Sequence, residues 1–551
     1  VATAITEMAA TAHEIARNIQ ETDNQIAHAK AHCEHTDQQL EDTQHRVTEL
    51  ATQGAQLQQH EQRAQRYERE IQFKDAKLEK ITFELARLKA WKFGARTERL
   101  NATQRQMFED TAAEDEADLQ AQLLALQGKA TTPAAQTPAR APRRQKLPEH
   151  LRRIEHRHDP ADTTCGCGQP MQRVGEDVSE RLDIVPAEFI VHRHVRGKWA
   201  CRCCQTLVQE PVAPQVVDKG LPTAGLVAHT LVSRFVDHVP YYRQEQINAR
   251  SGVHTPRSTL ASWAGAGGAA LTPLYEALRV FVLSARVLHA DETPVALLDP
   301  GAGKTRKAYV WAYARGAFDP IPAVVYDFAA GRAGRYPIEF LGRWSGTLTC
   351  DDYAGYGALL KLHARIEAGC LAHARRKFDE LAKAGASPVA AQALQRIAWL
   401  YRIEQEVADA DSAQRLLARR ERSVPLWNEL HVWLRRQRGQ VPDGGGIAAA
   451  IDYSLRRWDA LGRFLQDGNV AIDNNHIENL MRPWAMGRKA WLFAGSELAG
   501  QRAAMVMSLV QSARLNGHEP WAYLRDVLER LLEHPNHRID ELLPHRWKPA
   551  V

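Results

Sequence analysis

The chain has no long apolar run: no segment approaches the ~20 apolar residues that a membrane-spanning helix needs. Its first twenty residues hold neither a basic lead nor an apolar block, so we expect no signal peptide. A large excess of one charge is also missing, because 71 Lys and Arg face 66 Asp and Glu, a net charge of +5 over 551 residues. Any surface for an acidic partner must therefore come from local clusters of basic residues.

Glycine and proline are almost absent from the first hundred residues, which are rich in Ala, Gln, Glu and Arg. This composition predicts one long helix. A heptad register fits from Leu50 onward, although Gln53, His60 and Lys74 interrupt its d positions. We predict that residues 1–105 form a self-associating coiled coil, with a helix packed on its own chain as the alternative. The a positions are Leu50, Leu57, Ala64, Ile71, Leu78 and Leu85, and the d positions include Tyr67, Ile81 and Leu88.

Residues 106–154 change composition twice. An acidic stretch at 108–120 runs into a segment rich in Pro and Ala, which ends in basic residues. This composition predicts a flexible linker. Its basic end either contacts phosphates or simply stays hydrated, as charge runs usually do. The basic residues are Arg140, Arg143, Arg144, Lys146, Arg152 and Arg153.

Only eight cysteines are present, but five of them fall in two tight groups. Without an export signal, this grouping favours a metal site over disulfides. Two thiolate pairs can close a tetrahedral Zn²⁺ site, which is structural because four thiolates leave no open coordination position. We assign residues 155–215 to a zinc-binding module with strands between the two pairs; a metal-free cysteine cluster is the alternative. The predicted ligands are Cys165, Cys167, Cys201 and Cys204, with Cys203 competing for the fourth place.

The sequence of residues 220–270 predicts two helices joined by a short turn that contains a glycine. In the second helix, Leu260 and Trp263 would face the core, while Arg257 and Ser258 would be exposed. This is the layout of a helix-turn-helix, whose second helix can enter the major groove of DNA. Packed helix pairs are common in helical proteins, so a purely structural pair is the alternative.

Three acids lie where a metal-dependent reaction on phosphodiesters would need them. Asp291 and Asp351 are in strand-like segments, and Glu478 is at the start of a predicted helix. The 60 residues that separate the two aspartates fit three antiparallel strands, a helix and a fourth strand beside the first. This plan is that of a ribonuclease-H-like α/β core, which would extend over residues 280–515 with a helical insertion at about 375–470.

Carboxylate oxygens are hard ligands that suit Mg²⁺ or Mn²⁺. Two such ions about 4 Å apart can activate an attacking oxygen and stabilise the leaving oxygen. Each acid also has a structural alternative, because the aspartates could merely end strands and Glu478 could complete a capping box with Asn475. We expect a multidomain α+β protein that ends in a helical tail at residues 516–551.

At these residues the sequence resembles the transposases of the insertion-sequence 66 family, and the resemblance covers nearly the whole chain. The most specific stretches begin at His289, Asp351, Gly369 and Asp473, and they read HADETPV, DDYAGY, GCLAHARRKF and DNNHIEN. The family pattern has glycine after its second aspartate, where this chain has Asp352. Alignment through the tyrosine that follows makes Asp351 the catalytic residue.

The resemblance implies a DDE transposase that holds two Mg²⁺ (or Mn²⁺) ions on Asp291, Asp351 and Glu478. It would cut at the ends of its element and join the freed 3′-OH to target DNA. The implied partners are double-stranded DNA, further copies of the chain that join through the coiled coil, and small accessory proteins of the element. No membrane is implied, and the expected location is cytoplasmic and nucleoid-associated. An inactive DNA-binding protein and a nuclease without strand transfer are the alternatives. Further candidate DNA contacts, with solvated helix charge as their alternative, are His373, Arg375, Arg376, Lys377, Arg482, Arg488 and Lys489.

Overall fold

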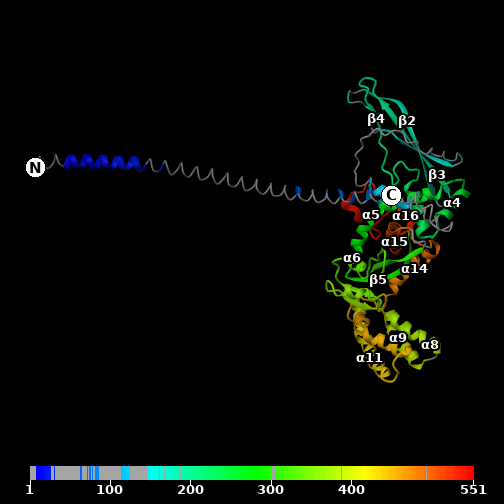
Figure 1. The fold of residues 1–551 in the computed structure, drawn as a ribbon. Coiled ribbons are helices and arrows are strands. Elements are labelled where there is room, and N and C mark those ends of the chain that lie inside the picture. The colour runs from blue at the N-terminus through cyan, green and yellow to red at the C-terminus, as the bar shows by residue number, and fades with distance from the viewer. Residues whose placement is uncertain are drawn as a thin grey trace. The chain divides into compact units, whose positions relative to one another are not determined.

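The computed structural model describes residues 8–26, residues 113–123, most of 147–550 and single positions between 30 and 85 (Figure 1). The chain divides into a unit of residues 1–80 and a unit of residues 81–551. In the first unit, residues 8–26 are helical and exposed along their whole length. Among the predicted seam positions, Leu50, Leu57 and Leu88 lie outside the described residues, and Ala64, Tyr67 and Ile71 are exposed. The coiled coil and its self-association therefore stay predictions.

The C-terminal end of the predicted heptad packs within its own chain. Ile81 is 4% exposed and Leu85 is 7% exposed. Both belong to a small apolar cluster with Leu119, against which Leu123 and Leu498 pack. For these two positions, the structure contains the alternative arrangement, in which the helix packs on its own chain.

The acidic part of the predicted linker is instead an ordered helix. Residues 113–123 are helical, and the carboxylates of Glu114, Asp115 and Asp118 are almost completely buried. They lie 2.7, 3.0 and 3.0 Å from the guanidinium of Arg502, which is fully buried itself. The linker prediction was wrong here, because local composition cannot reveal a buried arginine that lies 388 residues further along the chain.

A four-stranded sheet occupies the region that was predicted to form the strands of the cysteine module. Its central strand β3 (Glu188–Ala200) pairs antiparallel with β2 (Gln172–Val185) and parallel with β1 (Arg152–His158). The short β4 (Leu207–Gln209) pairs with the end of β3. Side chains of β2 and β3 reach the main hydrophobic core, so the sheet is attached by its own packing.

Three helices follow in the region predicted to be a helix-turn-helix. They are α3 (Ala224–Phe235), α4 (Tyr241–Arg250) and α5 (Arg257–Leu283). The turn between α4 and α5 contains Gly252, whose φ of +75° is readily adopted only by residues without a side chain. In α5, Leu260 and Trp263 are 1% and 3% exposed, which confirms the predicted inward face.

The second sheet has five strands in the order β7-β6-β5-β8-β9. The first three strands are antiparallel neighbours, whereas β8 runs parallel to β5 and β9 runs parallel to β8. A short helix, α6 (Arg335–Leu341), links β7 to β8. This order agrees with the one that the spacing of the two aspartates predicts. The strands are β5 (Val287–Asp299), β6 (Lys304–Arg315), β7 (Val324–Ala329), β8 (Thr347–Cys350) and β9 (Ile366–Gly369).

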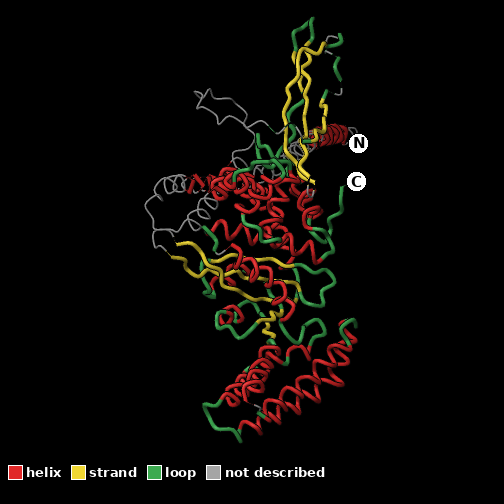
Figure 2. The backbone as a smooth tube through the Cα atoms, turned by 90° about the vertical axis from the view of Figure 1, so that its right-hand side faces the viewer, coloured by secondary structure: helices red, strands yellow, loops and turns green. Residues whose placement is uncertain are grey.

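A helical insertion follows β9 (Figure 2). Most of its buried apolar side chains belong to a second hydrophobic cluster, which also includes Val287 of β5. The insertion extends from Leu371 to Gln466, close to the predicted 375–470. The elements are α8 (Leu371–Gly385), α9 (Pro388–Glu406), α10 (Ser412–Ala418), the π-helical η2 (Arg419–Ser423), α11 (Val424–Arg438), α12 (Gly446–Arg456), α13 (Trp458–Leu461) and η3 (Arg463–Gln466).

The chain then returns to the five-stranded sheet through α14 (Asn475–Trp491) and α15 (Glu497–Leu515). Two serines of α15, Ser508 and Ser512, accept hydrogen bonds from backbone N–H groups of the edge strand β7 at 2.8 and 3.0 Å. These bonds satisfy an edge that would otherwise expose unpaired donors.

The C-terminal region is helical, as predicted, but it is packed into the main core. It contains α16 (Pro520–Arg530) and η4 (Asn536–Leu542), and α16 packs on α3. Leu543 and Trp547 are buried as well. Among the helices that the structure describes, none is long and apolar enough to cross a bilayer.

Candidate active site

Asp291 lies within β5, and Asp351 directly follows the end of the neighbouring strand β8. The parallel pairing of β5 with β8 aligns His289 with Thr349. Asp291 lies two residues after His289, and Asp351 lies two residues after Thr349, just past the last residue of β8. Because the two parallel strands lie side by side up to this point, the two carboxylates come close enough for the charge of Asp351 to raise the pKa of Asp291.

Glu478 comes from the first turn of α14, and the buried Asn474 fastens the start of this helix to β5. Nδ2 of Asn474 donates to the carbonyl of Ala290 at 2.9 Å, and Oδ1 accepts from Nδ1 of His289 at 2.8 Å. Burial lowers the pKa of His289 to about 3, so its imidazole stays neutral. These bonds hold the helix of Glu478 against the strand that carries Asp291.

The ionised form of Asp291 is disfavoured by its surroundings. Burial, followed by the charge of Glu292, raises the pKa of Asp291 from 3.8 to about 7, and the charges of Asp351 and Glu478 add to the rise. The N–H of Glu292 donates to its carboxylate at 2.9 Å and offsets part of this effect. The three predicted acids therefore lie close enough to repel one another, and a bound cation would relieve that repulsion.

Glu292 is a fourth acid at this place, but both of its carboxylate oxygens already accept hydrogen bonds. Nε of Arg332 donates to one of its oxygens at 2.8 Å, and the hydroxyl of the buried Tyr356 donates to the other at 2.9 Å. Because both oxygens are engaged, we interpret Glu292 as a structural neighbour of Asp291 rather than a further cation ligand.

The two consecutive aspartates after β8 have different partners. Asp351 accepts a hydrogen bond from the N–H of Tyr353 at 3.0 Å, and its charge acts on Asp291. Asp352 is paired instead with Arg457 at 2.6 Å and Arg456 at 3.3 Å, at the end of α12. This division supports Asp351 as the member of the triad.

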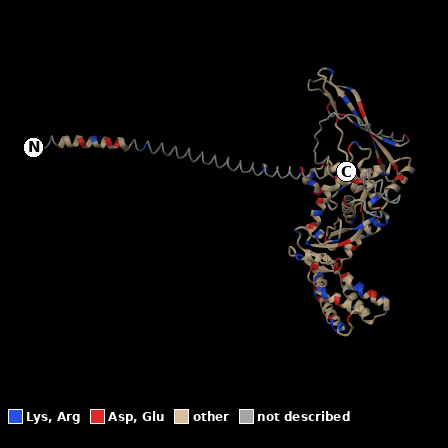
Figure 3. Cartoon of the chain, viewed as in Figure 1, with Lys and Arg blue, Asp and Glu red and all other residues tan. Residues whose placement is uncertain are grey.

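A polar groove runs past these acids, and its walls include Asp351, Arg332 and basic residues of the insertion. Figure 3 shows the Lys and Arg residues of the insertion in blue. Arg376 lies 3.7 Å from one oxygen of Glu478, and Nδ1 of His373 lies 3.7 Å from the other. Glu478 thus reaches across to α8 instead of turning back to the start of its own helix. The predicted phosphate contacts in this groove are His373, Arg376 and Lys377.

The region that contains the three acids matches a known family. The model of the "Transposase IS66 family" matches residues 219–502, just over half of the chain. The chain belongs to the transposase IS66 family. Three further models match flanking regions: the zinc-finger binding domain of transposase IS66 at 162–205, the IS66 C-terminal element at 508–545, and "Transposase C of IS166 homeodomain" at 80–155. These matches agree with a DNA-binding transposase that contains a zinc module.

Curated relatives come from Sinorhizobium fredii (strain NBRC 101917 / NGR234). Uncharacterized protein y4jD is 36% identical over 73% of this chain and 81% of its own length. Uncharacterized protein y4qI is 38% identical over 77% of this chain and 81% of its own length. Uncharacterized protein y4hP is 33% identical over 86% of this chain and 89% of its own length. The similarity thus extends over most of this IS66-family chain.

Other predicted DNA contacts of this IS66-family chain lie outside the lining of the groove. Arg375 is exposed on α8, and Arg482 and Lys489 are exposed on α14. Arg488 is engaged by the protein itself, since it donates to the hydroxyl of Thr293 at 3.2 Å and the carbonyl of Pro294 at 3.1 Å. At the start of α5, Arg257 is half-buried and Ser258 is exposed.

Three of the predicted zinc ligands follow the end of β3 in the zinc-finger region of this IS66-family chain. Cys201 is buried, whereas Cys203 and Cys204 are exposed. The N–H of Cys201 donates to the carbonyl of Thr206 at 2.9 Å and closes the turn. Cys165 and Cys167 lie outside the described residues, so the zinc ligand set, including the choice between Cys203 and Cys204, stays a prediction.

Sequence reasoning missed several residues of this site in the IS66-family chain. Asn474 was part of a recognised motif, but only its contacts reveal that it holds α14 on β5. No sequence signal singled out Arg332, Arg456 or Arg457, because their partners lie in distant elements.

Proposed function

We propose that this chain is a DDE transposase, which binds the ends of its insertion sequence, hydrolyses a phosphodiester there and joins the freed 3′-OH to target DNA. One observation carries the proposal: Asp291 of β5 lies so close to Asp351, which follows β8, and to Glu478 of α14 that their charges add to the rise of its pKa. All three acids lie inside the region that matches the family. The strand order and the position of the insertion support a ribonuclease-H-like core.

The carboxylate set fits Mg²⁺ or Mn²⁺. All three side chains offer hard oxygen ligands. The pKa of Asp291 is raised first by burial and then by the negative charge of its neighbours, and a bound cation would offset both effects. We assign two ions to Asp291, Asp351 and Glu478. When bound, such ions activate the attacking oxygen and stabilise charge on the phosphate and the leaving oxygen.

Other residues of the protein position the three acids and bind the DNA. Asn474 and His289 hold α14, and with it Glu478, against the strand of Asp291. Arg376 and Lys377 line the groove beside the acids and would bind the phosphates of DNA. The zinc module and the helices around α4 and α5 would hold the element's ends. The N-terminal helix would join copies of the chain, and accessory proteins of the element would complete the complex at the nucleoid.

The test is a strand-transfer assay with full-length protein, Mg²⁺ and linear DNA that carries the sequences flanking its gene. We expect wild type to cut and join, and both Asp291→Asn and Glu478→Gln to lose both steps. Asp352→Asn is the matched control, and we expect it to keep activity within a few-fold. Cutting without joining would indicate a nuclease, and DNA binding without cutting would indicate an inactive regulatory protein. Joining by the two triad variants would exclude this triad.

A further inference from the structure

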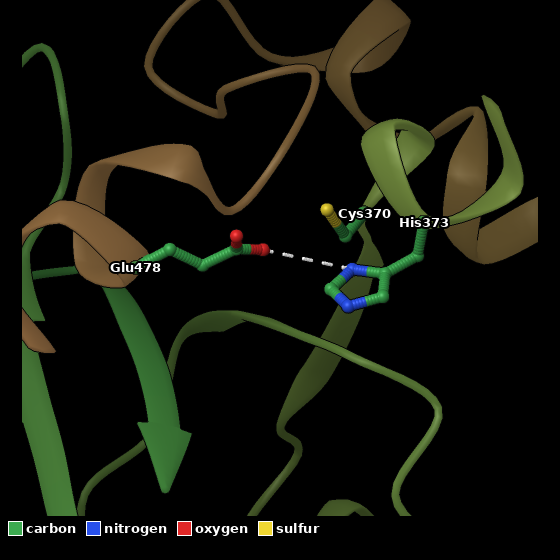
Figure 4. Close-up of side chains that lie close together, drawn as sticks. All are labelled: Cys370, His373 and Glu478. Carbon is green, nitrogen blue, oxygen red and sulfur yellow. Dashed lines mark ion pairs between the residues drawn. The ribbon is translucent and has the colours of Figure 1, made fainter. Parts of the chain in front are cut away.

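A second set of potential metal ligands overlaps the predicted triad. Cys370, His373 and Glu478 each offer one ligand atom, and these three atoms lie within 4.8 Å of one another (Figure 4). Cys370 directly precedes α8 and His373 lies in its first turn, so the two side chains share one side of the helix start. Glu478 reaches them from α14. Three ligands from two helix starts therefore converge on one point.

Two of these ligand atoms face each other without being satisfied. Nδ1 of His373 and Oε1 of Glu478 are buried, and neither has a hydrogen-bond partner among the described residues. They lie 3.7 Å apart, which is too far for a hydrogen bond. Zinc binds nitrogen and oxygen ligands at about 2.0–2.2 Å, so one ion between the two atoms could contact both.

The sulfur of Cys370 completes this set. It accepts a hydrogen bond from the N–H of Asn474 at 3.2 Å, directly before α14 begins. The positive end of a helix favours a thiolate, whereas burial acts in the other direction and raises the pKa of Cys370 to about 12. The thiol therefore stays protonated at neutral pH until a cation that binds sulfur displaces the proton.

We propose that Cys370, His373 and Glu478 form a binding site for a thiophilic divalent cation such as Zn²⁺, and that this ion inhibits the enzyme by withdrawing Glu478 from the magnesium-binding carboxylates. Sulfur, imidazole and carboxylate are the ligands that Zn²⁺ takes in proteins, whereas Mg²⁺ requires oxygen. Three protein ligands leave one coordination position open. The binding site stands on the geometry alone, but its inhibitory effect rests on the proposed transposase function.

The first experiment measures binding with the full-length protein, stripped of metal and then dialysed against Zn²⁺ or Co²⁺. We expect wild type to retain one Zn²⁺ per chain more than Cys370→Ser and His373→Gln, above the amount that the cysteine module holds in all samples. Bound Co²⁺ should show a thiolate charge-transfer band that Cys370→Ser weakens. Cys350→Ser, which replaces another buried thiol, is the control and should match wild type. Equal zinc content in wild type and in both site variants would overturn the proposal.

The second experiment adds increasing Zn²⁺ to the strand-transfer reaction in Mg²⁺. We expect half-inhibition of Cys370→Ser to need at least about tenfold more Zn²⁺ than wild type or Cys350→Ser needs. If wild type and the two variants all join DNA without Zn²⁺ and are inhibited at the same Zn²⁺ concentration, the inhibitory role is wrong. If the additional Zn²⁺ binds but wild type never joins DNA, the binding site stands and the proposed function fails.

Discussion

Asp291 occupies a position that is unfavourable for a carboxylate in the metal-free protein. Its burial and three neighbouring acids raise its pKa to about 7, and only one backbone donor offsets them. A residue that costs stability and carries a predicted chemical role is typical of a functional site. At the scale of single residues, the stability that the protein loses by burying the Asp291 carboxylate can be measured, and it indicates a cation-binding role.

Replacing Asp291 by asparagine should stabilise the metal-free protein. Its folded pKa of about 7 exceeds the unfolded value of 3.8, so the folded state binds more protons between these values and loses stability as the pH rises through that window. In EDTA at pH 8, we expect Asp291→Asn to be more stable than wild type by on the order of 2–4 kcal/mol, with the advantage shrinking toward pH 5. Urea unfolding measures this. Asp352→Asn, which loses ion pairs, should show no gain. No stabilisation by Asp291→Asn at pH 8 would contradict the account.

Asn474 and Asn475 form a matched pair of neighbouring asparagines with different surroundings. Asn474 is 1% exposed and bonds to β5, whereas Asn475 is exposed and bonds to Asp473. We expect Asn474→Ala to cost about 1–3 kcal/mol, because it leaves buried polar groups unpaired, and to raise the Mg²⁺ concentration needed for strand transfer. Asn475→Ala should change the stability and the Mg²⁺ requirement far less. Equal Mg²⁺ dependence in the two variants would show that Asn474 does not position Glu478.

The sequence alone is enough to propose the three acids as a site, but it does not reveal the residues that support them. Asp291 and Asp351 each lie in a strand-like motif, and their spacing predicted neighbouring strands, which the sheet contains. Arg332 balances Glu292 across 40 residues, a pairing that no local pattern specifies. Side-chain partners of this kind depend on the tertiary fold, which local spacing does not encode.

At the scale of elements, long-range ion pairs decided where prediction failed. The helical insertion was predicted well, because a long helical stretch between two core motifs is visible in the sequence. The helix at residues 113–123 was not, because its acidic composition favours solvent until Arg502 is considered. Three carboxylates on a fully buried arginine hold that helix on α15.

Removing the arginine should therefore destabilise the second unit strongly. We expect Arg502→Met to lower the free energy of unfolding by about 3–5 kcal/mol, because three buried carboxylates lose their counter-charge. Arg306→Met is the control, since Arg306 is half-exposed and lies 4.0 Å from Glu497; it should cost less than about 1 kcal/mol. Chemical denaturation compares the two. A similar small loss in both variants would mean that the buried cluster does not hold the helix.

At the scale of the whole molecule, modules that were predicted separately share one core. Side chains of the first sheet, of α3 to α5, of the five-stranded sheet and of the C-terminal helices belong to one continuous hydrophobic cluster. Sequence patterns suggest such boundaries from composition, but they do not show which apolar faces meet. The segment at residues 516–551 is thus part of the core rather than an appendage.

Truncations test this shared core. Deleting residues 516–551 removes α16 and uncovers the buried face of α3, so we expect aggregation or loss of a cooperative thermal transition. Deleting residues 1–80, which form the other unit, should leave that transition within about 2 °C of wild type. Circular dichroism during heating measures both. A C-terminal deletion that melts like wild type would contradict a common core.

The most direct test of the central claim exchanges a carboxylate for a thiolate. Mg²⁺ requires oxygen ligands, whereas the softer Mn²⁺ tolerates sulfur better. We predict that Asp351→Cys is inactive in strand transfer with Mg²⁺ and regains measurable joining with Mn²⁺, while Asp352→Cys joins DNA with either ion. The opposite result would contradict the assignment of Asp351 to the metal-binding triad: Asp351→Cys would be fully active in Mg²⁺, and Asp352→Cys would be inactive.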